Sequence, residues 1–303
     1  MRPGWLTLMF AAALIFSHPV SAQGDLPPAG RSRFDQLIGS QPVPFPFSRL
    51  VDAINRRMQT GSGGLPPLKI TLIPLGRSLQ RDAGAPDFFR YPRVVAAADG
   101  AGKPGIPPLK DRLFLGYHEK GTVIEVISYN DAAGRFEFQV VRDYRKGKTP
   151  QVFYARRSLC LACHQNAAPI FARPLWDETP ANPAIAARLK DARRDFYRVK
   201  LTGTDIAYFI DASTDRANLF SVWQTLWQQG CGPGEAGERC RLQAFAAALD
   251  YARRGSLPAP GILPELDRAW TSIWPHGLAI PNPDLPNRDP LAALQNPDND
   301  PLL

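Results

Sequence analysis

The residues best suited to chemistry lie in one short stretch, Cys160-Leu161-Ala162-Cys163-His164. Two thiols with two residues between them lie one helical turn apart, a spacing that matches the two vinyl groups on neighbouring edges of a porphyrin. The imidazole of His164 follows directly and would point under the ring, where it can ligate the iron. The pattern predicts one covalent haem, attached through Cys160 and Cys163, with His164 as the axial iron ligand.

Two other interpretations of this stretch are a zinc half-site and a redox dithiol. A zinc site requires a second pair of Cys or His residues at ligand spacing, and none follows in the sequence. A thioredoxin-like dithiol requires a flanking βαβ pattern, which is also missing. Haem attachment is therefore the favoured interpretation.

The stretch from Cys160 to His164 resembles the haem-attachment motif of c-type cytochromes. Pro169 resembles the proline that, in many of them, offers its backbone carbonyl to the proximal imidazole. The resemblance implies haem c, electron transfer and export, because bacteria join haem to such motifs outside the cytoplasmic membrane. The chain departs from the small-domain pattern of that family, since strands are expected before the motif and no methionine follows it.

The second axial position of the iron has three candidate ligands, in the order His276, Met58 and His118. An empty or water-filled position is an equal alternative. His276 lies in a loop flanked by Trp270 and Trp274, which suits a residue that reaches over a haem. Met58 lies on the apolar stripe of an expected helix and fits core packing as well. His118 precedes a turn, which favours a surface position.

The haem propionates require basic neighbours, and the nearest in sequence are Arg156, Arg157 and Arg173. Ile170, Phe171 and Trp176 are candidates for an apolar wall around the iron, although ordinary core packing would use the same residues. Ser158 is the expected N-cap of a short helix that carries the motif. No catalytic residue can be assigned from the sequence.

The first 22 residues have the organisation of a cleavable secretory signal peptide. Arg2 precedes an apolar run, and Val20-Ser21-Ala22 gives the small-x-small pattern of a cleavage site before Gln23. No later segment is long and apolar enough to span a membrane. We therefore expect an exported, periplasmic protein without a membrane span.

Cys231 and Cys240 bracket a short loop that contains Gly232-Pro233-Gly234. In an oxidising compartment such a pair is expected to form a local disulfide bond. Unpaired thiols are the alternative.

The 303-residue chain has 36 Lys and Arg against 28 Asp and Glu. The basic residues are scattered, which is typical of a solvated surface. A net positive charge would suit an acidic redox partner protein or membrane headgroups, whereas an exported protein is not expected to bind nucleic acid.

The fold is expected to be α+β, with a β-rich N-terminal half, a helical haem-bearing C-terminal half and an extended proline-rich tail. The regions after the signal peptide are a lead-in with an amphipathic helix (23–64), a β-rich region (65–155), a helical region (156–255) and the tail (256–303). Strands are expected at 69–73, 93–97, 113–117, 122–128, 135–141 and 151–154, and helices at 47–58, 183–201, 215–229, 236–254 and 264–273. Alternation in the strand at 135–141 predicts a sheet that is covered on one side.

Electron transfer through one covalent haem is the favoured function. The alternatives are a haem enzyme of peroxidase or oxygenase type, with His118 or His276 as an acid or base, and a haem-based sensor of a small gas. Both require an open distal side.

Overall fold

A computed structural model describes residues 30–60, 64–76, 81–164, 168–171, 175–256, 261, 263–280 and 288–296. The expected signal peptide and Arg173 lie outside the described residues. The strands are β1 (Leu68–Ile73), β2 (Arg93–Ala98), β3 (Leu113–His118), β4 (Val123–Asn130), β5 (Arg135–Arg142) and β6 (Gln151–Tyr154). The helices are α1 (Arg33–Ile38), α2 (Phe47–Arg57), α3 (Arg157–Cys163), α4 (Leu175–Glu178), α5 (Pro183–Asp191), α6 (Asp205–Gln229), α7 (Gly234–Arg254), α8 (Pro264–Ile273) and α9 (Pro290–Gln295).

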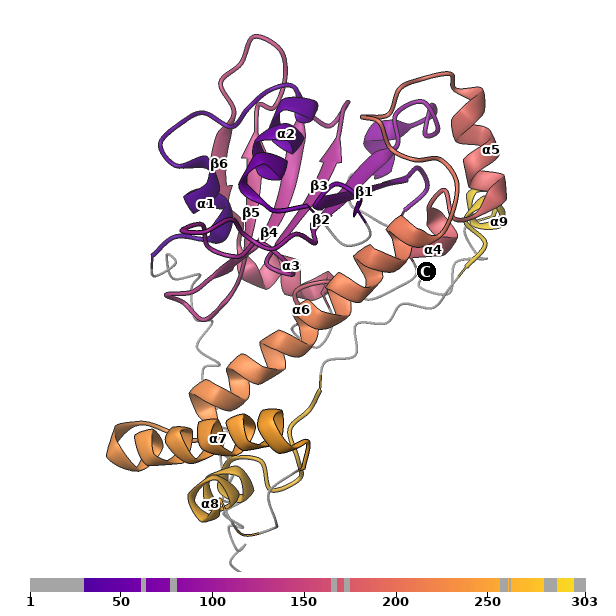
Figure 1. Cartoon of the computed structure of the whole chain (residues 1–303). Helices are drawn as coiled ribbons and strands as arrows, with labels where there is room; N and C mark the ends of the chain where they lie inside the picture. The colour runs from indigo at the N-terminus through magenta and orange to yellow at the C-terminus, as the bar shows by residue number, and fades with distance from the viewer. Residues whose placement is uncertain are drawn as a thin grey trace, which may run out of the picture.

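The six strands form one antiparallel sheet in which each strand pairs with its neighbour in sequence. Most of the helices follow the sheet in the chain, so the α+β prediction is confirmed (Figure 1). Helix α2 buries Phe47, Leu50 and Ile54 against one face of the sheet. Helix α6 crosses the other face, where Ile210 and Ala217 join a second apolar cluster.

The sheet is covered on both faces, so the prediction of a one-sided sheet is wrong. Glu137 and Gln139, which were expected to face solvent, are buried. The amide of Gln139 donates to Asp35 (2.8 Å) and accepts from the hydroxyl of Ser32 (2.7 Å), the N-cap residue of α1. Polar residues of β5 therefore hold a helix that the sequence did not predict.

Helix α6 begins at Asp205, ten residues before its predicted start. Its first half packs on the sheet through small residues, among them Ser213, Thr214 and Ala217, and its second half extends beyond the sheet towards α7 and α8 (Figure 1). Leu219 and Trp223 lie on the side of α6 that faces away from the sheet and are exposed.

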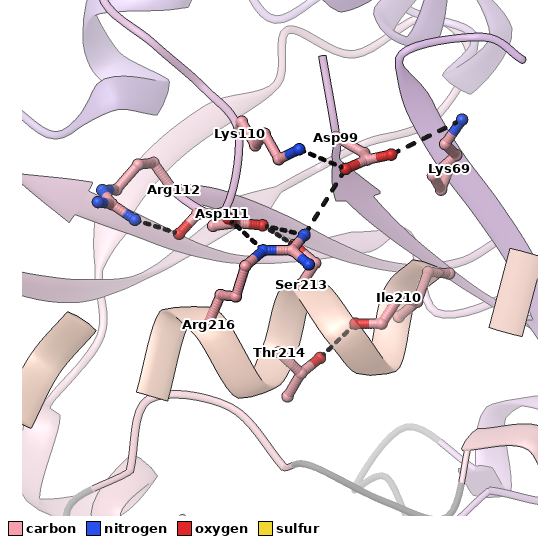
Figure 2. Close-up of polar contacts among 9 residues, drawn as sticks. All are labelled: Lys69, Asp99, Lys110, Asp111, Arg112, Ile210, Ser213, Thr214 and Arg216. Atoms are coloured by element: carbon pink, nitrogen blue, oxygen red, sulfur yellow. Dashed lines mark hydrogen bonds and ion pairs between the residues drawn. The ribbon is translucent and has the colours of Figure 1, made fainter. Parts of the chain in front are cut away.

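A network of charges, in which Asp99 and Asp111 are buried and Arg216 is partly exposed, fastens α6 to the sheet (Figure 2). Arg216 of α6 donates two hydrogen bonds to the carboxylate of Asp111 (2.7 and 2.9 Å), and the hydroxyl of Ser213 donates a third (2.6 Å). These bonds raise the pKa of Arg216. Asp99 forms ion pairs with Arg216 and with the buried Lys69, whose pKa burial lowers. The network fixes the axial position of α6 on β1 and β2.

Two further predicted elements differ from the structure. The helix predicted over 183–201 ends at Asp191, and Arg193 then takes a left-handed φ of 48°. The proline-rich tail contains the unpredicted helix α9, and the buried Arg288 before it donates hydrogen bonds to Glu178 (3.0 Å) and to the carbonyl of Leu75 (2.6 Å). This part of the tail is therefore fixed to the body of the protein.

Candidate haem-attachment site

Helix α3 carries both cysteines of the motif. Arg156 is its N-cap and Arg157 its first residue, so the prediction that Ser158 caps the helix is wrong. Cys160 and Cys163 lie three residues apart and therefore on one face of the helix. Neither is in a disulfide bond, and Cys163 is exposed. The two thiols thus share one side of a helix, as attachment to a single planar group requires.

His164 ends α3 and lies between two phenylalanine rings. Its imidazole stacks on Phe171 with a centroid distance of 4.4 Å and an interplanar angle of 9°. On another side the ring of Phe138, from β5, lies 5.2 Å away at 51°. The rings hold the imidazole in one orientation and exclude water from it. Phe171 was expected from the sequence as part of an apolar wall, whereas Phe138 was not assigned to the site.

Burial is the main cause that lowers the pKa of His164 to about 4. The negative charge of Glu125 opposes this effect, and the positive charges of Arg93 and Arg157 add to it. The imidazole is therefore neutral near pH 7, the form in which a nitrogen lone pair is available to a metal. Its Nδ1 atom is buried and has no hydrogen-bond partner among the described residues. The bond from this ring to the carbonyl of Pro169, implied by the resemblance, is thus not formed in the part of the chain described.

Among the described residues this buried ring nitrogen has no partner, and such a nitrogen suits a histidine that binds a further group. The chemistry of the donors also fits haem c, because two thiols on one helical face adjoin a neutral imidazole. The residues present therefore fit the group that the sequence pattern implies.

The loop that carries Phe171 is held by Asn218 of α6. The side-chain amide of Asn218 donates to the carbonyl of Ile170 (2.8 Å), and its oxygen accepts from the Ile170 N–H (3.2 Å). Ile170 itself packs on the apolar cluster under α6. The charge network of Figure 2 thus acts on the site indirectly, because it fixes the helix that positions Asn218. Sequence reasoning missed Asn218, which lies among apolar residues of a helix without a motif.

Arg93 and Glu125 form an ion pair of 2.6 Å on the sheet face towards His164. The guanidinium reaches across β3 at Gly116, where a Cβ atom would lie 2.3 Å from an Arg93 nitrogen. No motif in the sequence indicated that Arg93 and Glu125 would lie on the sheet face towards His164. The pair supplies polar groups within electrostatic reach of the imidazole.

The predicted propionate partners differ in their surroundings. Arg157 donates to the carbonyl of Phe136 and lies over the ring of Phe138, 5.5 Å from its centroid. Arg156, the N-cap residue of α3, is exposed to solvent. Leu159, which precedes Cys160 on α3, leaves 69% of its surface uncovered.

None of the three candidate distal ligands lies next to His164. Met58 is buried in the core cluster with α2, on the opposite face of the sheet. His276 is exposed and follows α8, at the far end of α6 from the sheet (Figure 1). His118 ends β3 and is only 1% exposed, so its predicted surface position is wrong. Its Nδ1 accepts from the N–H of Gly121 (3.2 Å), and it also hydrogen-bonds the backbone of Tyr91, so both ring nitrogens are engaged.

Other parts of the described chain give no competing site. Among the described residues no group of three or more His, Cys, Asp or Glu could hold a metal ion, and no helix is long and apolar enough to cross a membrane. The predicted disulfide between Cys231 and Cys240 is confirmed, with an S–S distance of 2.03 Å. Trp176 belongs to α4, but its side chain lies outside the described set.

Comparisons of the chain with protein-family models, with curated proteins and with solved structures find no significant match. The chemistry of the site therefore has to be argued from its own side chains.

Proposed function

We propose that the protein binds one haem c through thioether bonds to Cys160 and Cys163, with His164 as the proximal iron ligand. The observation that carries the proposal is the combination of two thiols on one face of α3 with a neutral, oriented imidazole at its end. A zinc half-site or a redox dithiol would need no stacked aromatic rings around the histidine.

Four side chains near the motif would have separate roles in haem binding. Phe138 and Phe171 orient the imidazole and keep water from it. Arg156 and Arg157 are close in sequence to the attachment residues and would balance the negative propionates. When bound, the haem supplies reversible one-electron chemistry at its iron.

The function proposed first is electron transfer. Cys163 and Leu159 are exposed, so a group bonded at Cys163 would have an edge at the molecular surface, as outer-sphere exchange with a redox partner protein requires. We propose export to the periplasm on the sequence of residues 1–22, since haem is attached to such motifs in that compartment.

A specific observation favours a second candidate, the binding of a small ligand at an open iron position. Met58 and His276 lie away from His164, and His118 uses its nitrogens in hydrogen bonds within the protein. With no second protein ligand the iron would be five-coordinate or hold water, as in haem enzymes and gas sensors.

The absorption spectrum of the purified mature protein, reduced and then exposed to carbon monoxide, tests both candidates. A low-spin spectrum that carbon monoxide does not change supports electron transfer. A high-spin spectrum that shifts with carbon monoxide supports ligand binding, and turnover of peroxide would then identify an enzyme. A colourless protein from cells that assemble cytochromes would contradict both.

A further inference from the structure

The second half of α6 and the adjacent α7 carry large apolar side chains that the described residues leave uncovered. On α6, Leu219, Trp223 and Trp227 recur every four residues and form a first stripe. On α7, Leu242, Phe245 and Leu249 form a second, at i, i+3 and i+7. The exposed fractions of these six side chains range from 45% to 67%. We call the two stripes together the apolar arm.

The α6 stripe faces away from the sheet. The residues of α6 that contact the sheet include Ile210 and Ala217, and Gln228 lies on the same side of the helix, against Gly134 in the turn between β4 and β5. At about 100° per residue, Leu219 and Trp223 fall on the side away from the sheet, and Trp227 lies on the flank of the helix next to them. The sheet therefore cannot cover them, and this helix buries one face while it exposes a second apolar face.

The two helices of the arm are joined rigidly. The disulfide between Cys231 and Cys240 links the end of α6 to the second turn of α7. Trp274, which follows α8, packs against Gly230 at the same joint, where an added Cβ would lie 3.2 Å from its ring. A rigid joint fixes the position of the stripes before any partner binds, which lowers the entropic cost of association.

The composition of the arm favours a protein partner over a lipid surface. No charged residue occurs from Ala217 to Gly234 or from Leu242 to Leu249. Arginines do flank the α7 stripe, but Arg239 forms ion pairs with Glu235 and Glu265, and Arg254 with Asp250, whereas a helix on an anionic membrane directs its basic residues to the headgroups. Interface cores between proteins are depleted of charge and enriched in aromatic residues, as the apolar arm is.

The area and the charge pattern fit a second copy of the same chain. The three aromatic rings and three leucines leave on the order of 500 Å² of apolar surface uncovered, since a large aromatic side chain buries about 150–250 Å² when fully covered. A standard interface takes about 800 Å² from each partner, and roughly two thirds of it is apolar in homodimers. The charged residues at the ends of the α7 stripe are of both signs, among them Glu238, Arg241 and Asp250, so a twofold arrangement allows opposite charges to meet at its rim.

From these observations we propose that the protein forms a symmetric homodimer through the apolar arm. Each copy would bury the stripes of α6 and α7 against the same residues of the other. The proposal is independent of haem binding, because the arm lies at the end of α6 away from α3 and the sheet (Figure 1).

Sedimentation velocity of the full mature protein over a hundredfold range of concentration tests the proposal. The wild type should have twice the mass of one chain at the higher concentrations, and Trp223→Glu and Phe245→Glu should each halve it. The matched control is Leu294→Glu on α9, at the opposite end of α6, where a leucine exposed to 46% should be replaced without effect. Unchanged far-ultraviolet circular dichroism would show that both arm variants fold.

Three results would overturn the proposal. The first is a wild type that remains monomeric throughout the range. The second is a dimer that both arm variants leave intact, and the third is a dimer that Leu294→Glu disrupts as strongly as they do.

Discussion

The chain contains two pairs of cysteines that the structure treats differently. Cys231 and Cys240 form a disulfide across the joint between two helices, with their Cα atoms 5.5 Å apart. Cys160 and Cys163 lie within a single helix, one turn apart, and neither is in a disulfide bond. The first pair constrains the chain, and the second is the pair that we propose to bind haem.

The difference shows that the surroundings of a cysteine pair decide its role. Cys240 is buried within the joint that it closes, whereas Cys163 is exposed beside a neutral histidine. Each pair can be removed separately, so their proposed roles can be separated by experiment.

The largest effect is expected from Cys160→Ala combined with Cys163→Ala. Both points of attachment are lost, so the protein made in cells that assemble cytochromes should contain no covalent haem after denaturation. Haem-dependent staining of a denaturing gel measures this directly. The matched control, Cys231→Ala with Cys240→Ala, should stain as strongly as the wild type, and equal loss of stain in both variants would refute the division of roles.

Removal of the disulfide in the variant Cys231→Ala/Cys240→Ala should lower the free energy of unfolding by about 2–3 kcal/mol, because the bond closes a loop of about ten residues in the unfolded chain. Urea denaturation followed by circular dichroism measures the change. A shift of the midpoint without a change in the visible spectrum is expected. An altered spectrum would mean that the joint and the haem site are coupled.

Asn218→Ala should destabilise the protein by about 1–3 kcal/mol, because the N–H and the carbonyl of Ile170 each lose a partner. It should also change the visible spectrum, since the loop that places Phe171 on His164 is released. Ser221→Ala, one turn further along α6, removes only a bond within the helix and is the control. An unchanged spectrum in Asn218→Ala would show that Asn218 does not position the site.

The smallest effect is expected from His118→Gln, on the pH dependence of the free energy of unfolding. The pKa of His118 is lowered below the ordinary value of 6.5 chiefly by burial. The unfolded chain therefore binds more protons below about pH 6.5, so stability should fall as the pH decreases, with at most about 1.4 kcal/mol per pH unit from this group. His118→Gln should make the fall of stability below pH 6.5 shallower, and the lowered pKa of His164 leaves part of the slope in place. The same slope in the variant would assign the effect to other groups.

The strands were predicted almost to the residue, because short apolar runs bounded by turn residues are local features of sequence. β6 (Gln151–Tyr154) and α8 (Pro264–Ile273) match their predicted limits. The spacing of Cys160, Cys163 and His164 is local as well, and the haem attachment that it predicts remains a proposal. The predictions that failed depended on contacts between distant parts of the chain. Gln139 is buried and accepts a hydrogen bond from the N-cap residue of α1, and His118 is buried as well.

The helices also show that the sequence does not reveal contacts between distant parts of the chain. The apolar stripe of α6 correctly predicted a helix, and two residues of that stripe, Leu219 and Trp223, are exposed in the structure. Periodicity reveals that an apolar face exists, and it does not reveal whether the rest of the chain covers that face. The contacts of Asn218, Arg93 and Glu125 with the site depend on tertiary structure and leave no pattern in the sequence.

The central claim is that Cys160 and Cys163 carry a covalently bound haem. The most direct test is the mass of the intact mature protein, measured under denaturing conditions after expression in cells that assemble cytochromes. The account predicts the mass of the processed polypeptide plus one haem. A mass equal to that of the polypeptide alone would contradict it.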